Sequence, residues 1–223
     1  HHATQAAWVH ELAPKALVFE MLTEAQAKAV TPENRISESS LEAALGWNSS
    51  GWPDFSMYYP IFAAAPNAAV FGAAVPRDRL RAVMDADLVE VVGVEVAQRF
   101  GLDRPLPSGQ QEERENLQMA AHCNALPAAL LPRMVNVQRA RDAALAQAAL
   151  AALQAHGTPV VVITGNGHAR TDWGAPFLMQ TAAPEVRYFA LGQSEAGQYP
   201  QGDFSITVDG PAVDRGNPCD AFK

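Results

Sequence analysis

The chain has 223 residues, 48% of them hydrophobic, which is enough to bury the core of one domain. Asp and Glu total 24 against 16 Lys and Arg, and the formal charge of -8 argues against a nucleic-acid partner, whose phosphates attract basic proteins. No apolar run approaches the roughly 20 residues that a membrane-spanning helix requires, so we expect a soluble domain.

Short apolar runs alternate along the chain with segments of helical spacing. In chain order, the expected elements are a helix over 3–13, a strand over 16–22, short helices capped by Thr23 and Ser40, a helix over 54–65, a strand over 68–75, a helix opened by Pro76, a helical tract over 110–156 broken at Pro127 and Pro132, a strand over 158–164, and further strands over 185–191 and 203–208. This order predicts an α/β fold in which a mostly parallel β-sheet is flanked by helices, formed as a single domain over 1–223 with a helical insertion.

Two polar residues follow predicted strands, at the edge where parallel α/β sheets bind ligands. Glu20 ends an apolar run, where an ionised carboxylate needs a hydrogen bond, a charged partner or a cation. His168 follows the strand over 158–164 through a turn of Gly, Asn and Gly. A structural alternative stays open for each, because Glu20 can cap a helix or pair with an arginine and His168 can bond to backbone groups.

Three further features have more than one interpretation. Tyr58 and Tyr59 are adjacent on a predicted helix, so at most one belongs in the core and the other is available to a ligand. Asp142 shares a helix face with Gln138 and Arg141, and a solvated polar face is the usual explanation. The two cysteines, Cys123 and Cys219, fit no zinc motif; they are either free or bridged, and we favour the bridge.

An ordered set of segments resembles the ChaN-like haem-binding lipoproteins of bacterial iron uptake, in a superfamily with the Tiki metalloproteases and erythromycin-esterase-like proteins. The segments are Leu17–Met21, Trp52–Ile61, Gly72–Arg77, His122-Cys123, Gln138–Asp142 and Gly165–His168. The resemblance covers nearly the whole chain, and the ordered set is more specific than any of its parts.

The resemblance implies that the ligand is ferric haem, held by a tyrosine phenolate and shared between two subunits with stacked porphyrins. The matching position is Tyr58, with Tyr59 one residue away. A phenolate suits ferric iron, whose charge lowers the pKa of the phenol. His168, Glu20, Trp52 and His2 are the other residues expected around the haem, and Trp47, Phe55 and Phe62 are candidates, with Trp52, for flat apolar walls.

The sequence departs from the family pattern at its start. Members usually carry a lipoprotein signal and a strand ending in Gly-Glu-x-His-Asp, followed by a His-His pair. His1 and His2 match that pair, whereas the strand is absent, so we expect the domain to lack its N-terminal part. Relatives often have Asn before the Pro-Arg turn, where this chain has Ala74-Val75. The resemblance also implies a periplasmic or outer-membrane-anchored lipoprotein.

Three hypotheses follow. The first is a haem-binding protein of bacterial iron or haem uptake, more a binding protein than an enzyme, with haem, a second copy and the uptake machinery as partners. The alternative is a metal-dependent hydrolase in which Glu20 and His168 serve a divalent metal ion. The third is an interaction module with a vestigial site.

Overall fold

The computed structural model describes residues 1–213, 216 and 219–220. The chain divides into two compact units. The first unit comprises His1–Ala74 and Ala144–His168, and the second comprises Val75–Ala143 and the described part of Ala169–Lys223. Each unit is described by itself below.

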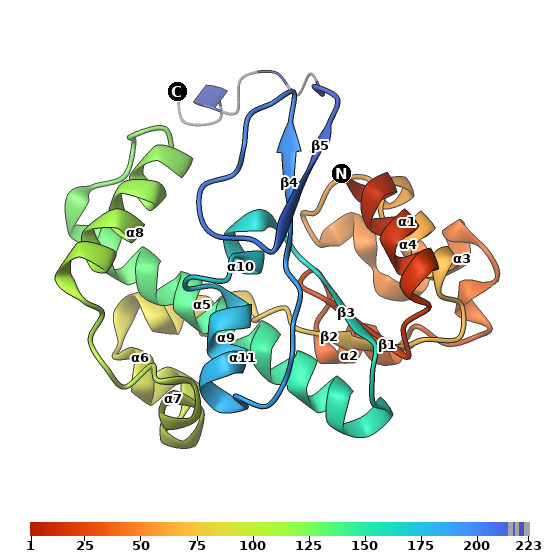
Figure 1. The fold of residues 1–223 in the computed structure, drawn as a ribbon, viewed down its shortest axis with the longest axis horizontal. Helices are drawn as coiled ribbons and strands as arrows, with labels where there is room; N and C mark the ends of the chain where they lie inside the picture. Colours follow the sequence, from red (N-terminus) through yellow and green to blue (C-terminus); the bar gives the residue numbers. More distant parts are fainter. Residues whose placement is uncertain (214–215, 217–218, 221–223) are drawn as a thin grey trace. The chain divides into compact units, whose positions relative to one another are not determined.

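A parallel three-stranded sheet forms the centre of the first unit. Its strands are β1 (Ala16–Phe19), β2 (Ala69–Gly72) and β3 (Val160–Ile163), in the order β2-β1-β3. Phe19 is in register with Gly72 on one side and with Ile163 on the other, so the carboxyl ends of the three strands meet at one edge (Figure 1). The α/β class and the parallel pairing are therefore as predicted.

Helices surround this sheet. The α-helices of the first unit are α1 (His2–Leu12), α2 (Glu24–Lys28), α3 (Glu38–Leu45), α4 (Tyr59–Ala64) and the end of α9 (Leu131–His156), and 3-10 turns lie at Asn34–Ile36, Trp47–Ser49 and Phe55–Met57. Thr23 begins α2 with a capping box, as expected of a Thr three residues before Gln. The cap of α3 is Ser37, not the predicted Ser40, since the Ser37 hydroxyl accepts the Ser40 amide hydrogen at 3.1 Å.

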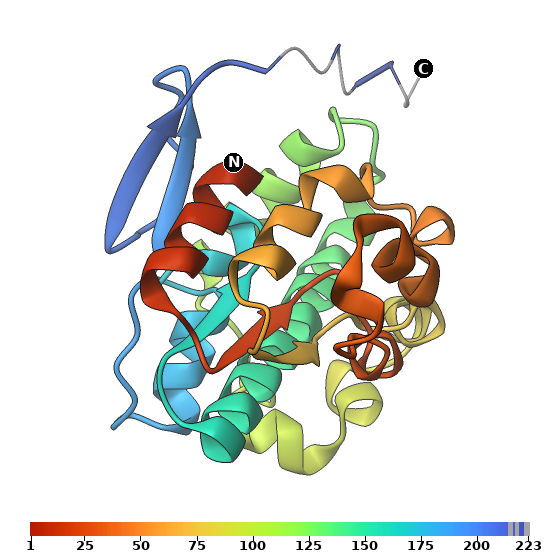
Figure 2. The same cartoon turned by 90° about the vertical axis from the view of Figure 1, so that its right-hand side faces the viewer.

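The main core lies between the sheet and the pair α1 and α4, which pack side by side (Figure 2). Side chains alternate along β1, so Leu17 and Phe19 face this core, and the Phe19 ring stacks on Phe62 of α4 at 4.3 Å. The opposite face of the sheet is covered by the end of α9, where the His156 ring meets Phe71 of β2 edge-on. Burial on both faces explains the continuous apolar run that predicts β1.

The second unit is mostly helical. Its elements are α5 (Arg77–Asp85), α6 (Leu88–Val92), α7 (Val94–Phe100), α8 (Ser108–Ala121), a 3-10 turn at Ala128–Leu130, the first half of α9, α11 (Ala175–Ala182), β4 (Leu191–Glu195) and β5 (Ile206–Gly210). The helix α10 (Asn166–Ala169) spans one of the three points at which the chain passes from one unit to the other. Cys123 and Cys219 form a disulfide, as predicted.

Three expectations are corrected in this unit. Pro132 does not break a helix, because it occupies the first turn of α9, where its missing N–H is no loss. The strand expected over 185–191 is not formed, since parallel pairing with β5 starts at Leu191 opposite Ile206. Asp142 is not on a solvated face, as only 1% of it is exposed.

No helix within the described part of the chain combines the length and the apolar character needed to cross a membrane.

Candidate functional site

Glu20 lies at the carboxyl edge of the sheet and is held by the end of β3. It directly follows β1, and its backbone N–H donates to the carbonyl of Ile163 at 3.1 Å. Its Oε2 accepts from the Thr164 hydroxyl at 2.5 Å and from the Gly165 amide at 3.1 Å. With 8% of the residue exposed, the carboxylate obtains from the protein the hydrogen bonds that burial requires.

His168 approaches the same carboxylate from the other side. It sits on α10, which follows β3 after two residues, and 5% of it is exposed. Its Nε2 lies 3.7 Å from Oε1 of Glu20, a distance at which a protonated imidazole forms an ion pair. The predicted meeting of Glu20 and His168 at the strand ends is therefore confirmed as geometry.

Tyr58, the residue directly before α4, lies near enough to Glu20 to respond to its charge. The side chain is 4% exposed, and its ring contacts His2 of α1 at 4.3 Å and Trp47 at 4.8 Å between centroids. Burial raises the pKa of the Tyr58 phenol above its ordinary value, and the negative charge of Glu20 raises it further. Four of the six expected site residues, Glu20, His168, Tyr58 and His2, are thus gathered around one buried polar centre.

The remaining expected residues pack against the core of the first unit. Tyr59 is partly buried, and its ring contacts Phe55 at 6.1 Å. Trp52 is partly buried and packs against the core. Three of the four residues considered as porphyrin walls are core residues in the structure, with at most 2% exposed: Trp47, Phe55 and Phe62.

The sequence interpretation missed Thr164, whose hydroxyl donates to Glu20 at 2.5 Å. The signal was available, because the parallel register that pairs Phe19 with Ile163 places the next two residues, Glu20 and Thr164, at the same level of the sheet. Thr164 directly follows β3 and Glu20 directly follows the neighbouring β1, so the parallel register alone predicts a hydrogen bond between their side chains.

Within the described residues, no group of three or more His, Cys, Asp and Glu side chains is placed to hold a metal ion. The pair of Glu20 and His168 is accompanied by a phenol and a threonine hydroxyl, which favours a hydrogen-bonded polar centre over a closed site for a divalent cation.

Comparisons with known proteins agree with this fold. Residues 1–178 match the family model described as haem-binding uptake, Tiki superfamily, ChaN. A solved structure of ChaN from Campylobacter jejuni, titled for its cofacial heme binding, is similar with a TM-score of 0.70 and 16% sequence identity, over 93% of this chain and 81% of the other. The search of curated proteins gave no significant match.

Proposed function

The chain belongs to the haem-binding uptake family of the Tiki superfamily that includes ChaN, and on that premise we propose that it binds haem through the phenolate of Tyr58. The observation that carries the proposal is the family match over residues 1–178. Haem is the cargo in this proposal, and Tyr58 is the group that recognises its iron.

The surroundings of Tyr58 support it as the ligand. Burial raises the pKa of the Tyr58 phenol above its ordinary value, and the nearby charge of Glu20 raises it further. A ferric ion reverses this preference, because its charge stabilises the phenolate and adds an attraction to Glu20. In this proposal, binding to the haem iron would displace the phenol proton that burial and Glu20 otherwise favour.

Access to Tyr58 requires a local movement in the first unit. The residue is 4% exposed, and one neighbour of its ring is His2, in the first turn of α1. A first helical turn is the part of a helix that opens most easily, because its N–H groups lack partners within the helix. We propose that this turn shifts when haem binds, and that the imidazole of His2 then lies beside the porphyrin.

Tyr59 is the natural comparison for Tyr58. It is more accessible than Tyr58, and its ring contacts Phe55. In the proposal Tyr59 and the partly buried Trp52 provide apolar surface to the porphyrin, whereas the iron is held by Tyr58.

A haemin titration followed by absorption spectroscopy tests the assignment. Wild type is expected to bind saturably, and Tyr58→Phe to bind at least about tenfold more weakly, because one bond from ligand to iron is lost. Tyr59→Phe is the matched control, with the same atom removed one residue away, and it is expected to bind as wild type does. Equal affinity of the two variants for haem would refute Tyr58 as the ligand.

The stoichiometry of the same titration tests the assembly. The solved ChaN is described as binding heme cofacially, and we propose that two copies of this chain bring their haems face to face. One haem per chain, with a monomer that becomes a dimer when haem is added in light scattering, is the expected result. A haem-loaded monomer would contradict the dimer and leave the ligand assignment intact.

We also propose that the protein works outside the cytoplasm, alongside haem or iron uptake machinery. The disulfide between Cys123 and Cys219 supports this, since disulfides persist in oxidising compartments such as the bacterial periplasm. Fractionation of cells that express the full-length protein checks the location, and recovery from the cytoplasm would oppose it.

A further inference from the structure

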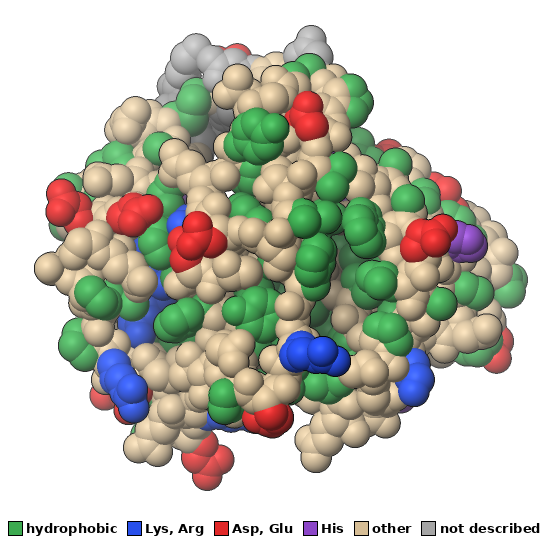
Figure 3. Space-filling view, in the orientation of Figure 1, with side chains coloured by type: hydrophobic (Ala, Val, Ile, Leu, Met, Phe, Trp, Pro, Cys, Tyr) green, Lys and Arg blue, Asp and Glu red, His purple; other side chains and the backbone are tan. Residues whose placement is uncertain are grey.

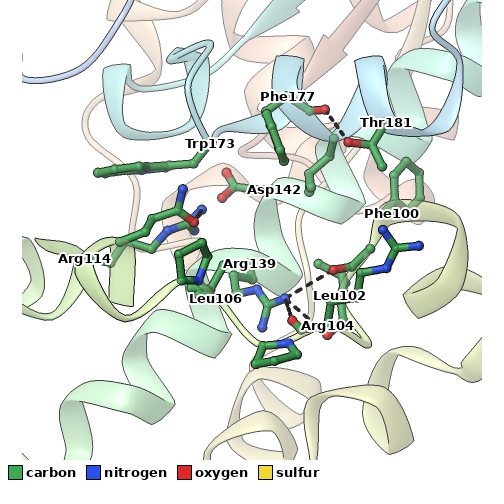
Figure 4. A pocket seen from close by; sticks show the side chains of 15 residues that line it. Phe100, Leu102, Arg104, Leu106, Arg114, Arg139, Asp142, Trp173, Phe177 and Thr181 are labelled. Atoms are coloured by element: carbon green, nitrogen blue, oxygen red, sulfur yellow. Dashed lines mark hydrogen bonds between the residues drawn. The ribbon is translucent and has the colours of Figure 1, made fainter. Parts of the chain in front are cut away.

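The second unit contains a cavity that the proposed haem site does not involve. Its volume is about 260 Å³, roughly the space of nine waters. The walls are formed by the loop after α7, by α8, by α9 and by the segment from Trp173 through α11 (Figure 4). The lining is largely apolar, with Phe100, Leu106 and Phe177 among its members.

Polar side chains also line the cavity, and three of them are arginines. Arg104, Arg114 and Arg139 line the cavity together with one carboxylate, that of Asp142. The cavity is therefore cationic in a chain whose formal charge is -8. On the outer surface, the side where α8 is drawn carries acidic, basic and apolar side chains together (Figure 3).

Arg139 has a structural role that occupies its donors. Its Nη2 donates to the carbonyls of Leu102 at 3.2 Å and Arg104 at 3.1 Å. These bonds fix the loop after α7, so the guanidinium of Arg139 holds one wall of the cavity in place.

Arg114 differs from Arg139 in this respect. It is 7% exposed, and its Nη2 donates to Gln110 at 3.2 Å, while its Nε and Nη1 are buried without a hydrogen-bond partner. The guanidinium points toward Trp173, whose ring centroid lies 4.9 Å away, and toward Asp142 (Figure 4). A buried cation with two unused donors in the wall of a cavity is costly unless something in that cavity accepts from it.

We propose that this cavity is a binding site for a small organic monocarboxylate with an aromatic or branched aliphatic body, recognised by Arg114. The carboxylate accepts from the unused donors of Arg114, and the apolar body packs against the apolar wall. A single negative charge suits the site, because Asp142 lies beside Arg114 and repels a dianion such as a phosphate ester. The volume, below that of pockets for drug-sized ligands, limits the ligand to a small one.

Isothermal titration with phenylacetate tests the proposal on the whole protein. Saturable binding is expected for phenylacetate, with binding at least about tenfold weaker for phenylacetamide, which has the same shape without the charge. Acetate tests the apolar body and is expected to show no saturation over the same range. Equal binding of the acid and the amide, or no binding of phenylacetate, would overturn the proposal.

Two variants locate the site. Arg114→Gln is expected to reduce phenylacetate binding to the level of the amide, whereas Arg81→Gln removes an exposed arginine of α5 and should bind as wild type does. Should Arg114→Gln not fold, as judged by circular dichroism, Leu106→Trp decides, because it fills the cavity without removing a charge. Undiminished binding to Leu106→Trp would refute the site. Tyr58→Phe should still bind phenylacetate, so this site and the haem proposal fail or succeed separately.

Discussion

At the scale of single residues, Tyr58 shows how one buried carboxylate sets the behaviour of its neighbours. Glu20 receives hydrogen bonds from Thr164 and Gly165, which stabilise its charge inside the core. That stabilised charge in turn disfavours a second negative charge on the Tyr58 oxygen. A neutral phenol in the haem-free protein and a phenolate on ferric iron are both consistent with this arrangement.

The raised pKa of Tyr58 makes a prediction about stability at high pH. In the unfolded chain the phenol ionises near its ordinary value, whereas in the fold it keeps its proton to a higher pH. The folded state then binds more protons than the unfolded state above about pH 10, so the free energy of unfolding falls as the pH rises through this range. Urea unfolding of wild type and Tyr58→Phe between about pH 9 and 11 should show a smaller loss in the variant.

Glu20→Gln separates the two causes of this raised pKa. Removal of the charge is expected to lower the pKa of Tyr58 toward its ordinary value while burial remains, as followed by phenolate absorbance on alkaline titration. Glu42→Gln, on α3, serves as the control for a changed net charge. An unchanged titration curve in Glu20→Gln would contradict the electrostatic link between the two residues.

At the scale of elements, the contact between β2 and the segment before α2 depends on a glycine. A Cβ on Gly72 would overlap the backbone carbonyl of Thr23, and backbone cannot move aside as a flexible side chain can. We expect Gly72→Ala to lower the free energy of unfolding by about 1–3 kcal/mol in urea denaturation. Gly109→Ala is the control, because no atom lies within 4 Å of its Cβ position on α8 and the change should be neutral or slightly stabilising. Equal effects of the two changes would refute the close contact.

The sequence predicts elements best where a local pattern and the final environment agree. The apolar run of β1 and the capping residue Thr23 are recognisable because burial on two faces and an exposed helix start each leave a distinct pattern. The strand expected over 185–191 fails for the opposite reason. Its residues suit a strand, but pairing depends on where β5 lies, and that is a tertiary property.

The residues of the candidate site and of the cavity also differ in how far the sequence predicts their positions. Glu20 and His168 follow predicted strands, so their meeting is accessible to topology alone. The burial of Asp142 and Arg114 cannot be predicted from topology. Polar residues at helical spacing give the same sequence pattern on a solvent-exposed helix face and on a face that lines an internal cavity. Sequence spacing shows which residues share a face but not what covers it.

At the scale of the whole molecule, the disulfide is the covalent constraint with the largest reach. It joins Cys123 and Cys219 across 96 residues, and the chain-entropy model gives about 4.7 kcal/mol for a loop of that order. Reduction is therefore expected to lower the melting temperature, whereas the double variant Cys123→Ser, Cys219→Ser should melt low with or without reductant. Thiol labelling of the unfolded, non-reduced protein should find no free thiol, and two labelled cysteines would refute the bridge.

The strand order β2-β1-β3 also has a consequence for synthesis on the ribosome. β1 can pair with β2 once both have been synthesised, whereas β3, the partner of its other edge, is synthesised about 90 residues after β2. At 5–20 residues per second that interval lasts on the order of 5–20 s. During it the nascent chain presents an apolar strand with one unpaired edge, the kind of surface that invites association with other strands. Chaperones that bind nascent chains thus have several seconds in which to protect this edge before β3 covers it.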